Sequence, residues 1–164
     1  MKKLFIIRHA KSDQGFFGPD FDRPLNKRGM HDAPMMAEKL KLRQPLIDAF
    51  ISSPANRAKT TAGLFHSTYN ANDDTLLYVK ELYHAPAETF YNAITAIDDR
   101  YNSVALFAHN PGITYFINSL HAGTAIDNMP TCGVFAVSAS IHRWRDFAVA
   151  KKDFLFFDYP KLMG

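Results

Sequence analysis

The alternation of short apolar segments with segments of helical periodicity is the feature that most constrains the fold of this chain. Leu4–Ile7 and Ser103–Ala108 are continuous apolar runs bounded by polar residues, a pattern typical of strands buried on both faces. Between them, apolar residues from Met35 to Leu42 recur at helical spacing, although Pro34 leaves the start of this helix open. The chain is therefore predicted to alternate strands and helices.

The remaining segments continue this alternation. Helices are predicted for Asn56–Tyr69, Pro86–Ile97 and Gly112–Leu120, and strands for Ala49–Ile51, Leu76–Val79, Gly133–Ser138 and Phe147–Phe157. Such an order favours a three-layer α/β/α sandwich with a largely parallel central sheet. We find no linker or internal repeat, so residues 1–164 are predicted to form a single domain.

Composition excludes several classes of protein. Hydrophobic residues make up 47% of the 164 residues and the net charge is only +3, so disorder is not expected. The basic residues are scattered, which speaks against nucleic-acid binding and fits a small anionic substrate better. No stretch approaches the roughly 20 apolar residues of a membrane span. With Cys132 as the single cysteine, no internal disulfide can form, and a reducing cytoplasmic location is expected.

Three polar clusters follow predicted strands. Arg8 and His9 come directly after the first strand, Ser52–Pro54 follows the second and leads to Arg57, and His109 follows the strand that ends at residue 108. Open α/β sheets bind ligands at the carboxyl ends of their strands. We therefore expect two arginines and two histidines to meet at one edge of the sheet.

This set of side chains suits phosphoryl transfer. Arginine can donate forked hydrogen bonds to two phosphate oxygens, and a neutral imidazole nitrogen can attack phosphorus. Because catalysis of this reaction is mainly positioning and electrostatic stabilisation, Arg8, Arg57 and His109 are candidates for holding phosphate, with His9 as nucleophile. Ser12 and Asn110 are candidates for supporting hydrogen bonds.

The same segments resemble a known family. Residues 4–12 (LFIIRHAKS) are similar to the opening of the histidine phosphatase superfamily, with Ala10 where the family usually has glycine, as in its short phosphohistidine phosphatase (SixA-like) branch. The resemblance continues through residues 20–29 (DFDRPLNKRG), 52–62 (SSPANRAKTTA), 108–112 (AHNPG) and 129–133 (MPTCG). It thus covers nearly the whole chain in the expected order.

The resemblance implies a phosphoglycerate mutase-like fold and a phosphatase that needs neither metal nor organic cofactor. It implies that His9 accepts the phosphoryl group and that Arg8, Arg57 and His109 complete the pocket. The superfamily often places an acidic proton donor after the third strand, where this chain has Glu81. Asp13, Asp20 and Asp22 of the first loop are rival donors.

The expected substrate is a phosphorylated protein carrying phosphohistidine, or a small phosphoester. Three alternatives stay open: a phosphomutase, a non-catalytic phosphate-binding module, and a zinc hydrolase that uses His9 and His109. The last lacks nearby carboxylate or thiolate ligands.

Arg23 and Arg28 are expected to pair with Asp20 and Asp22. Phe16 and Phe17 are candidates for a lid or a partner surface. The sequence leaves the oligomeric state open.

Overall fold

A six-stranded sheet forms the centre of the molecule in the computed structural model, which describes residues 1–163. The strand order is β3-β2-β4-β1-β5-β6. Strands β1 to β4 are parallel, and β5 is antiparallel to both of its neighbours. The strands are β1 (Lys2–Arg8), β2 (Ala49–Ser52), β3 (Leu76–Tyr78), β4 (Ser103–Ala108), β5 (Val134–Ala139) and β6 (Asp153–Asp158).

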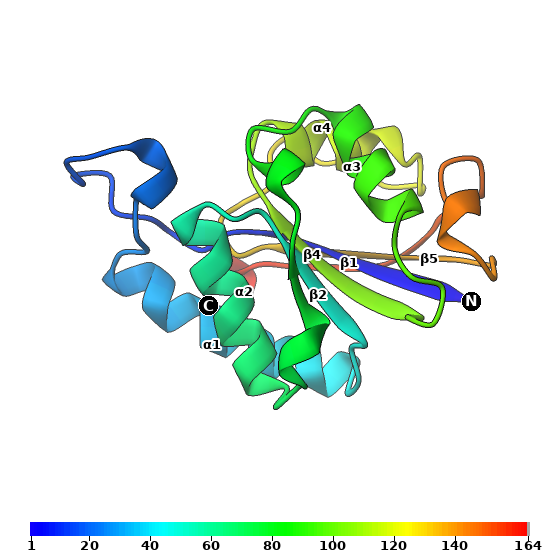
Figure 1. Cartoon of the computed structure of the whole chain (residues 1–164), viewed down its shortest axis with the longest axis horizontal. Coiled ribbons are helices and arrows are strands. Elements are labelled where there is room, and N and C mark those ends of the chain that lie inside the picture. The colour runs from blue at the N-terminus through cyan, green and yellow to red at the C-terminus, as the bar shows by residue number, and fades with distance from the viewer. Residues whose placement is uncertain (164) are drawn as a thin grey trace.

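Two pairs of helices cover the sheet (Figure 1). α1 (Lys27–Arg43) packs beside α2 (Asn56–Thr68) on one face, and α3 (Ala87–Thr95) packs beside α4 (Gly112–Ser119) on the other. Five short 3-10 helices lie in the connections: η1 (Asp20–Asp22), η2 (Asp73–Thr75), η3 (Lys80–Leu82), η4 (Trp144–Asp146) and η5 (Pro160–Met163). The predicted three-layer sandwich with a largely parallel sheet is confirmed.

The alternation of side chains along the strands divides the core in two. In β1, Leu4 and Ile6 pack toward α3 and α4, whereas Phe5 and Ile7 pack toward α1 and α2. All four are buried, which explains why the strand has a continuous apolar run. The two core clusters hold the sheet between the helix layers and fix the positions of the strand ends.

Several predicted boundaries differ from the structure. α1 begins at Lys27, ahead of the apolar run, because the Asn26 side chain accepts a hydrogen bond of 2.8 Å from the Gly29 amide and caps the helix. Pro34 lies inside this helix. The predicted strand Phe147–Phe157 is wrong in its first half, since β6 begins only at Asp153. No helix among residues 1–163 is both long and apolar enough to cross a membrane.

Candidate active site

The carboxyl ends of β1, β2 and β4 bring the predicted residues together. β4 lies between β1 and β2, and its Ala108 pairs with Arg8 of β1. His9 and His109, which follow these two residues, have ring centroids 5.2 Å apart. Arg57 reaches the same place from the first turn of α2. The fold thus places two arginines and two histidines at one edge of the sheet.

A cavity of about 360 Å³ lies at this edge and is strongly basic. Arg8, Lys11, Arg23 and Arg57 line it with four positive charges. Within the described part of the chain no carboxylate lines it. The other lining side chains are polar or imidazole groups, from Ser12, Gln14, Thr131, Asn110, His9, His84 and His109. Such a cavity suits a compact anion.

His9 is held in one tautomer by the backbone. Its Nδ1 lies 2.7 Å from the carbonyl oxygen of Ala10, and because a carbonyl only accepts, Nδ1 carries the proton. The Nε2 atom therefore keeps its lone pair. Burial, with a contribution from the charge of Arg8, lowers the pKa of His9 to about 3. At neutral pH the imidazole is therefore uncharged, with Nε2 unprotonated.

His109 has a different support. Its Nε2 lies 2.7 Å from the hydroxyl of Ser53, and that hydroxyl already accepts a hydrogen bond of 3.2 Å from the Ala55 amide. Ser53 can therefore donate its proton to Nε2, and in that arrangement His109 carries its own proton on Nδ1. This Nδ1 is buried and has no partner among the described residues. Burial and the neighbouring His9 lower the pKa of His109 to about 2.

Each of the two arginines is anchored through its terminal nitrogens, and each keeps an Nε atom without a partner among the described residues. Arg57 donates from Nη1 to the backbone oxygen of Asp20 at 2.9 Å and from Nη2 to its carboxylate at 3.0 Å. Arg8 donates from Nη1 to the oxygen of Met129 at 2.9 Å. The Nε atoms of both arginines are buried and lack a partner within residues 1–163. Oriented donors of this kind can bind the oxygens of a phosphoryl group.

Ser12 and Asn110 both lie in the lining of the cavity. The Ser12 hydroxyl accepts hydrogen bonds from Arg23 and from Gln14. The Asn110 amide donates to the Met129 oxygen at 3.0 Å, the same oxygen that receives Arg8. Asn110 therefore helps to fix the carbonyl that orients Arg8.

Asp20 connects η1 to the cavity. Its carboxylate accepts from the Tyr83 hydroxyl at 2.8 Å and from Arg23 at 2.9 Å, in addition to Arg57. The hydrogen bond from Tyr83, followed by those from the two arginines, holds the pKa of Asp20 well below its usual range. Because it is ionised at neutral pH, Asp20 is poorly suited to donate a proton.

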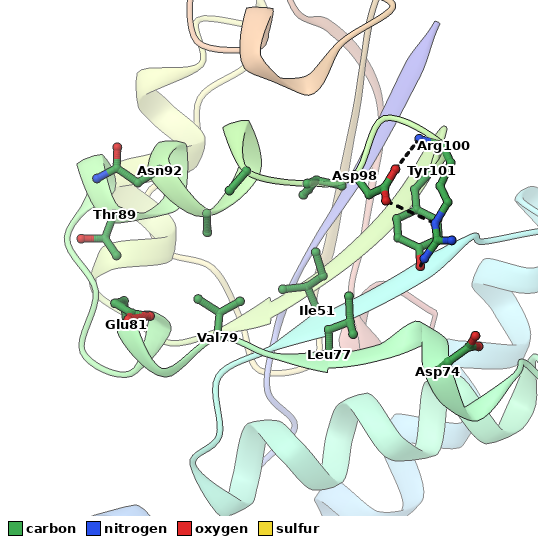
Figure 2. A pocket seen from close by; sticks show the side chains of 13 residues that line it. Ile51, Asp74, Leu77, Val79, Glu81, Thr89, Asn92, Asp98, Arg100 and Tyr101 are labelled. Carbon is green, nitrogen blue, oxygen red and sulfur yellow. Dashed lines mark hydrogen bonds and ion pairs between the residues drawn. The ribbon is translucent and has the colours of Figure 1, made fainter.

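Glu81 lies elsewhere. Figure 2 shows it with Val79 and Thr89 on the wall of a separate cavity of about 830 Å³, between α3 and the β2–β3 edge of the sheet. The chain turns through η3, and His84, which follows η3, lines the basic cavity that contains His9. The structure does not bring Glu81 to His9, and its role as proton donor stays a prediction that this placement does not support.

Sequence reasoning missed several residues of the site. Ser53, Tyr83 and His84 were not assigned a role, although Ser53 was part of the polar cluster after β2. Arg23 pairs with Asp20 as expected but also lines the cavity. The pairing expected for Arg28 is wrong: it binds Asp32 one helical turn away, with both oxygens at 3.1 Å.

The residues present do not assemble a metal site. Among residues 1–163, no group of three or more His, Cys, Asp or Glu side chains is arranged to hold an ion. Within the described part of the chain, no third ligand is arranged with His9 and His109, and a zinc hydrolase needs three.

Comparisons with known proteins agree with this fold. Residues 4–88 match the family model of the histidine phosphatase superfamily, branch 1. The uncharacterized protein ML1117 of Mycobacterium leprae is 29% identical over 168 residues, covering 94% of this chain and all of that protein. Among solved structures, the protein histidine phosphatase SixA complexed with tungstate matches with a TM-score of 0.84 and 21% identity over 99% of both chains.

A second structure, the mycobacterial glucosyl-3-phosphoglycerate phosphatase Rv2419c with VO3, matches with a TM-score of 0.70 and 17% identity over 95% of this chain and 98% of that one. A basic pocket with several histidines at the carboxyl edge of the sheet is a site that suits the binding of phosphate groups. The chain belongs to the histidine phosphatase superfamily, branch 1, and its fold is that of SixA. Membership supports phosphatase activity, that is, a hydrolase acting on phosphate.

Proposed function

We propose that this protein is a metal-independent phosphatase that forms a phosphohistidine intermediate on His9. The Nε2 lone pair attacks phosphorus, an N–P bond forms, and the bond from phosphorus to the leaving oxygen or nitrogen breaks with its electron pair. Water then attacks phosphorus and the N–P bond breaks. Phosphate is released, and neutral His9 is regenerated. The observation that supports this most directly is the Nδ1 contact with Ala10, which leaves Nε2 as the nucleophilic atom.

The other residues stabilise charge in this scheme. Arg8 and Arg57 bind the equatorial oxygens of the transferring group, and the Nδ1–H of His109 supplies a further donor. Lys11 and Arg23 add positive charge to the lining of the cavity.

The proposed substrates are phosphohistidine on a protein and small phosphomonoesters. The likeness to SixA, described as a protein histidine phosphatase, favours the first, and the likeness to a glucosyl-3-phosphoglycerate phosphatase supports the second. An accessible cavity of about 360 Å³ suits both.

The test is phosphate release from p-nitrophenyl phosphate and from a phosphohistidine protein, each with a chelator present. We expect turnover that resists the chelator and disappears in His9→Ala. The matched control is His142→Ala, because His142 is exposed and does not line the cavity. Rapid quenching with labelled substrate should trap an acid-labile, base-stable phosphoenzyme in the unaltered protein.

Four results would contradict the proposal. Activity that survives in His9→Ala would show that His9 is not the nucleophile. Activity that is lost on adding the chelator would show that the reaction needs a metal. Binding of phosphate without turnover would identify a binding module. Transfer of the phosphoryl group to a second alcohol in preference to water would identify a mutase.

A further inference from the structure

A second cavity adjoins the cavity that contains His9, and Arg8 belongs to the lining of both. It measures about 310 Å³, and Arg8, Lys11 and Thr131 line both cavities. Its other polar lining groups are Arg28, Asp32, Tyr159 and Lys161. A ligand that places phosphate beside Arg8 can therefore extend directly into this second space.

The fold builds this cavity from distant parts of the chain. Lys11 follows β1, Arg28 lies in the first turn of α1, and Thr131 precedes β5. β6 runs in the same direction as β1 because both are antiparallel to β5, so its carboxyl end lies at the edge that holds His9. Tyr159 and Lys161 follow β6 and reach the cavity from there.

The charge in the cavity is positive and largely uncompensated. Four basic side chains face one carboxylate, that of Asp32. Asp32 is buried and already bound by Arg28, with His31 at 3.3 Å. Within residues 1–163, neither Lys11 nor Lys161 has a carboxylate at ion-pair distance. Two ammonium groups, with the hydroxyls of Thr131 and Tyr159, thus face the space beside the phosphate cavity.

We propose that this second cavity binds a further anionic group of the substrate, a carboxylate or a second phosphate, while the scissile phosphate lies against His9. The inference rests on the proposed function, because it places the scissile phosphate in the first cavity. It defines the substrate class as phosphorylated compounds with a second negative charge close to the phosphate. An acidic residue beside a phosphorylated histidine in a peptide presents the same chemistry.

The first experiment measures kcat/KM for matched phosphates that differ in this charge. Carboxyphenyl phosphates, in meta and para forms, are compared with the uncharged carbamoylphenyl phosphates at constant ionic strength. Phosphohistidine peptides with Asp or with Asn beside the phosphorylated residue form the second arm. A higher kcat/KM for the charged compound only among the aryl phosphates indicates a small-molecule substrate. A higher kcat/KM for the Asp peptide indicates a protein substrate. Either result supports anion binding in the second cavity.

The variant Lys161→Glu separates the second cavity from the first, because Lys161 lines only the second. The control is Lys151→Glu, which makes the same charge change at an exposed residue before β6, at the opposite edge of the sheet. We expect Lys161→Glu to lower the ratio of charged to uncharged kcat/KM by about fivefold, as for a partly exposed charge pair, and Lys151→Glu to leave it unchanged. An unaltered ratio in Lys161→Glu would overturn the proposal.

A binding measurement distinguishes this result from failure of the proposed function. Carboxyphenylphosphonate and carbamoylphenylphosphonate are not hydrolysed, so calorimetry with the unaltered protein and both lysine variants requires no turnover. Tighter binding of the charged phosphonate that is lost only in Lys161→Glu supports the second cavity even if no phosphate is released. Equal binding of both phosphonates excludes it, whatever the activity toward p-nitrophenyl phosphate.

Discussion

The Ser53 hydroxyl and the Nε2 atom of His109 are 2.7 Å apart, and this contact holds the imidazole that lines the basic cavity. Removing the hydroxyl in Ser53→Ala leaves the imidazole free to exchange tautomers and to rotate. Because a buried hydrogen bond to a functional group contributes roughly 1–3 kcal/mol, we expect kcat/KM to fall by about tenfold to a hundredfold.

The neighbouring serine provides the control. The Ser52 hydroxyl donates to the Ser53 carbonyl at 2.8 Å and does not contact His109. Steady-state kinetics of Ser52→Ala should therefore show a much smaller loss than Ser53→Ala. Equal losses in the two variants would indicate a general effect on the strand end.

Asp20 is predicted to position Arg57 and not to donate a proton, because its pKa lies well below the usual range. In Asp20→Asn, kcat/KM should fall by about the same factor for p-nitrophenyl phosphate and for an alkyl phosphate, whose leaving group needs a proton far more. A loss confined to the alkyl phosphate would instead make Asp20 the acid.

Glu81 can be tested with the same pair of substrates. Since its side chain lies in the larger cavity beside α3, Glu81→Gln should change kcat/KM for neither substrate by more than about twofold. A selective loss with the alkyl phosphate would restore Glu81 as the donor and would require the segment after β3 to rearrange during the reaction.

The buried histidines predict how stability depends on pH. His9 has a pKa of about 3 and His109 of about 2 in the folded protein, against an ordinary value of 6.5. Between these values the unfolded chain binds more protons, so stability falls as the pH drops below 6.5. The limiting slope is about 1.4 kcal/mol per pH unit for each histidine.

Urea unfolding at a series of pH values measures this slope. His9→Asn and His109→Asn should each flatten the dependence between pH 6.5 and the folded-state pKa values, whereas His142→Asn should leave it as it is. Slopes that are identical in all three variants would show that neither buried imidazole is responsible.

Replacing glycine by alanine is expected to have opposite effects at Gly112 and at Gly63. A Cβ atom on Gly112, at the start of α4, would lie 1.8 Å from the Ala85 carbonyl oxygen, beside the segment that carries Tyr83 and His84. Gly112→Ala should therefore destabilise the fold by about 1–3 kcal/mol and reduce activity. Around Gly63 in α2 there is nothing within 4 Å, so Gly63→Ala should stabilise the fold by about 0.5–1 kcal/mol. Thermal unfolding of both variants checks the contrast.

Much of the fold could be predicted because local patterns encode it. The strand Ser103–Ala108 was predicted with the bounds that the structure shows, since its six residues are buried on both faces and read as one apolar run. The error at Phe147–Phe157 arises because such a burial pattern is missing there. β6 is an edge strand with mostly exposed residues at its start, and no burial pattern marks where it begins.

The site divides in a similar way. Arg8, His9 and His109 follow strands whose ends must meet in a parallel sheet, so their proximity follows from topology. The contact of Tyr83 with Asp20 joins residues 63 positions apart in two irregular segments. No periodicity relates such segments, and their contact depends on the turns of η1 and η3, which lie beside α2 and α3.

The central position of β1 has a consequence for how the protein is made. β1 is synthesised first, yet both of its partners, β4 and β5, come from beyond residue 102. At typical elongation rates a ribosome needs about 5–20 seconds to reach β4 after completing β1. During that time the apolar run of β1 and the histidine that follows it have no sheet to join.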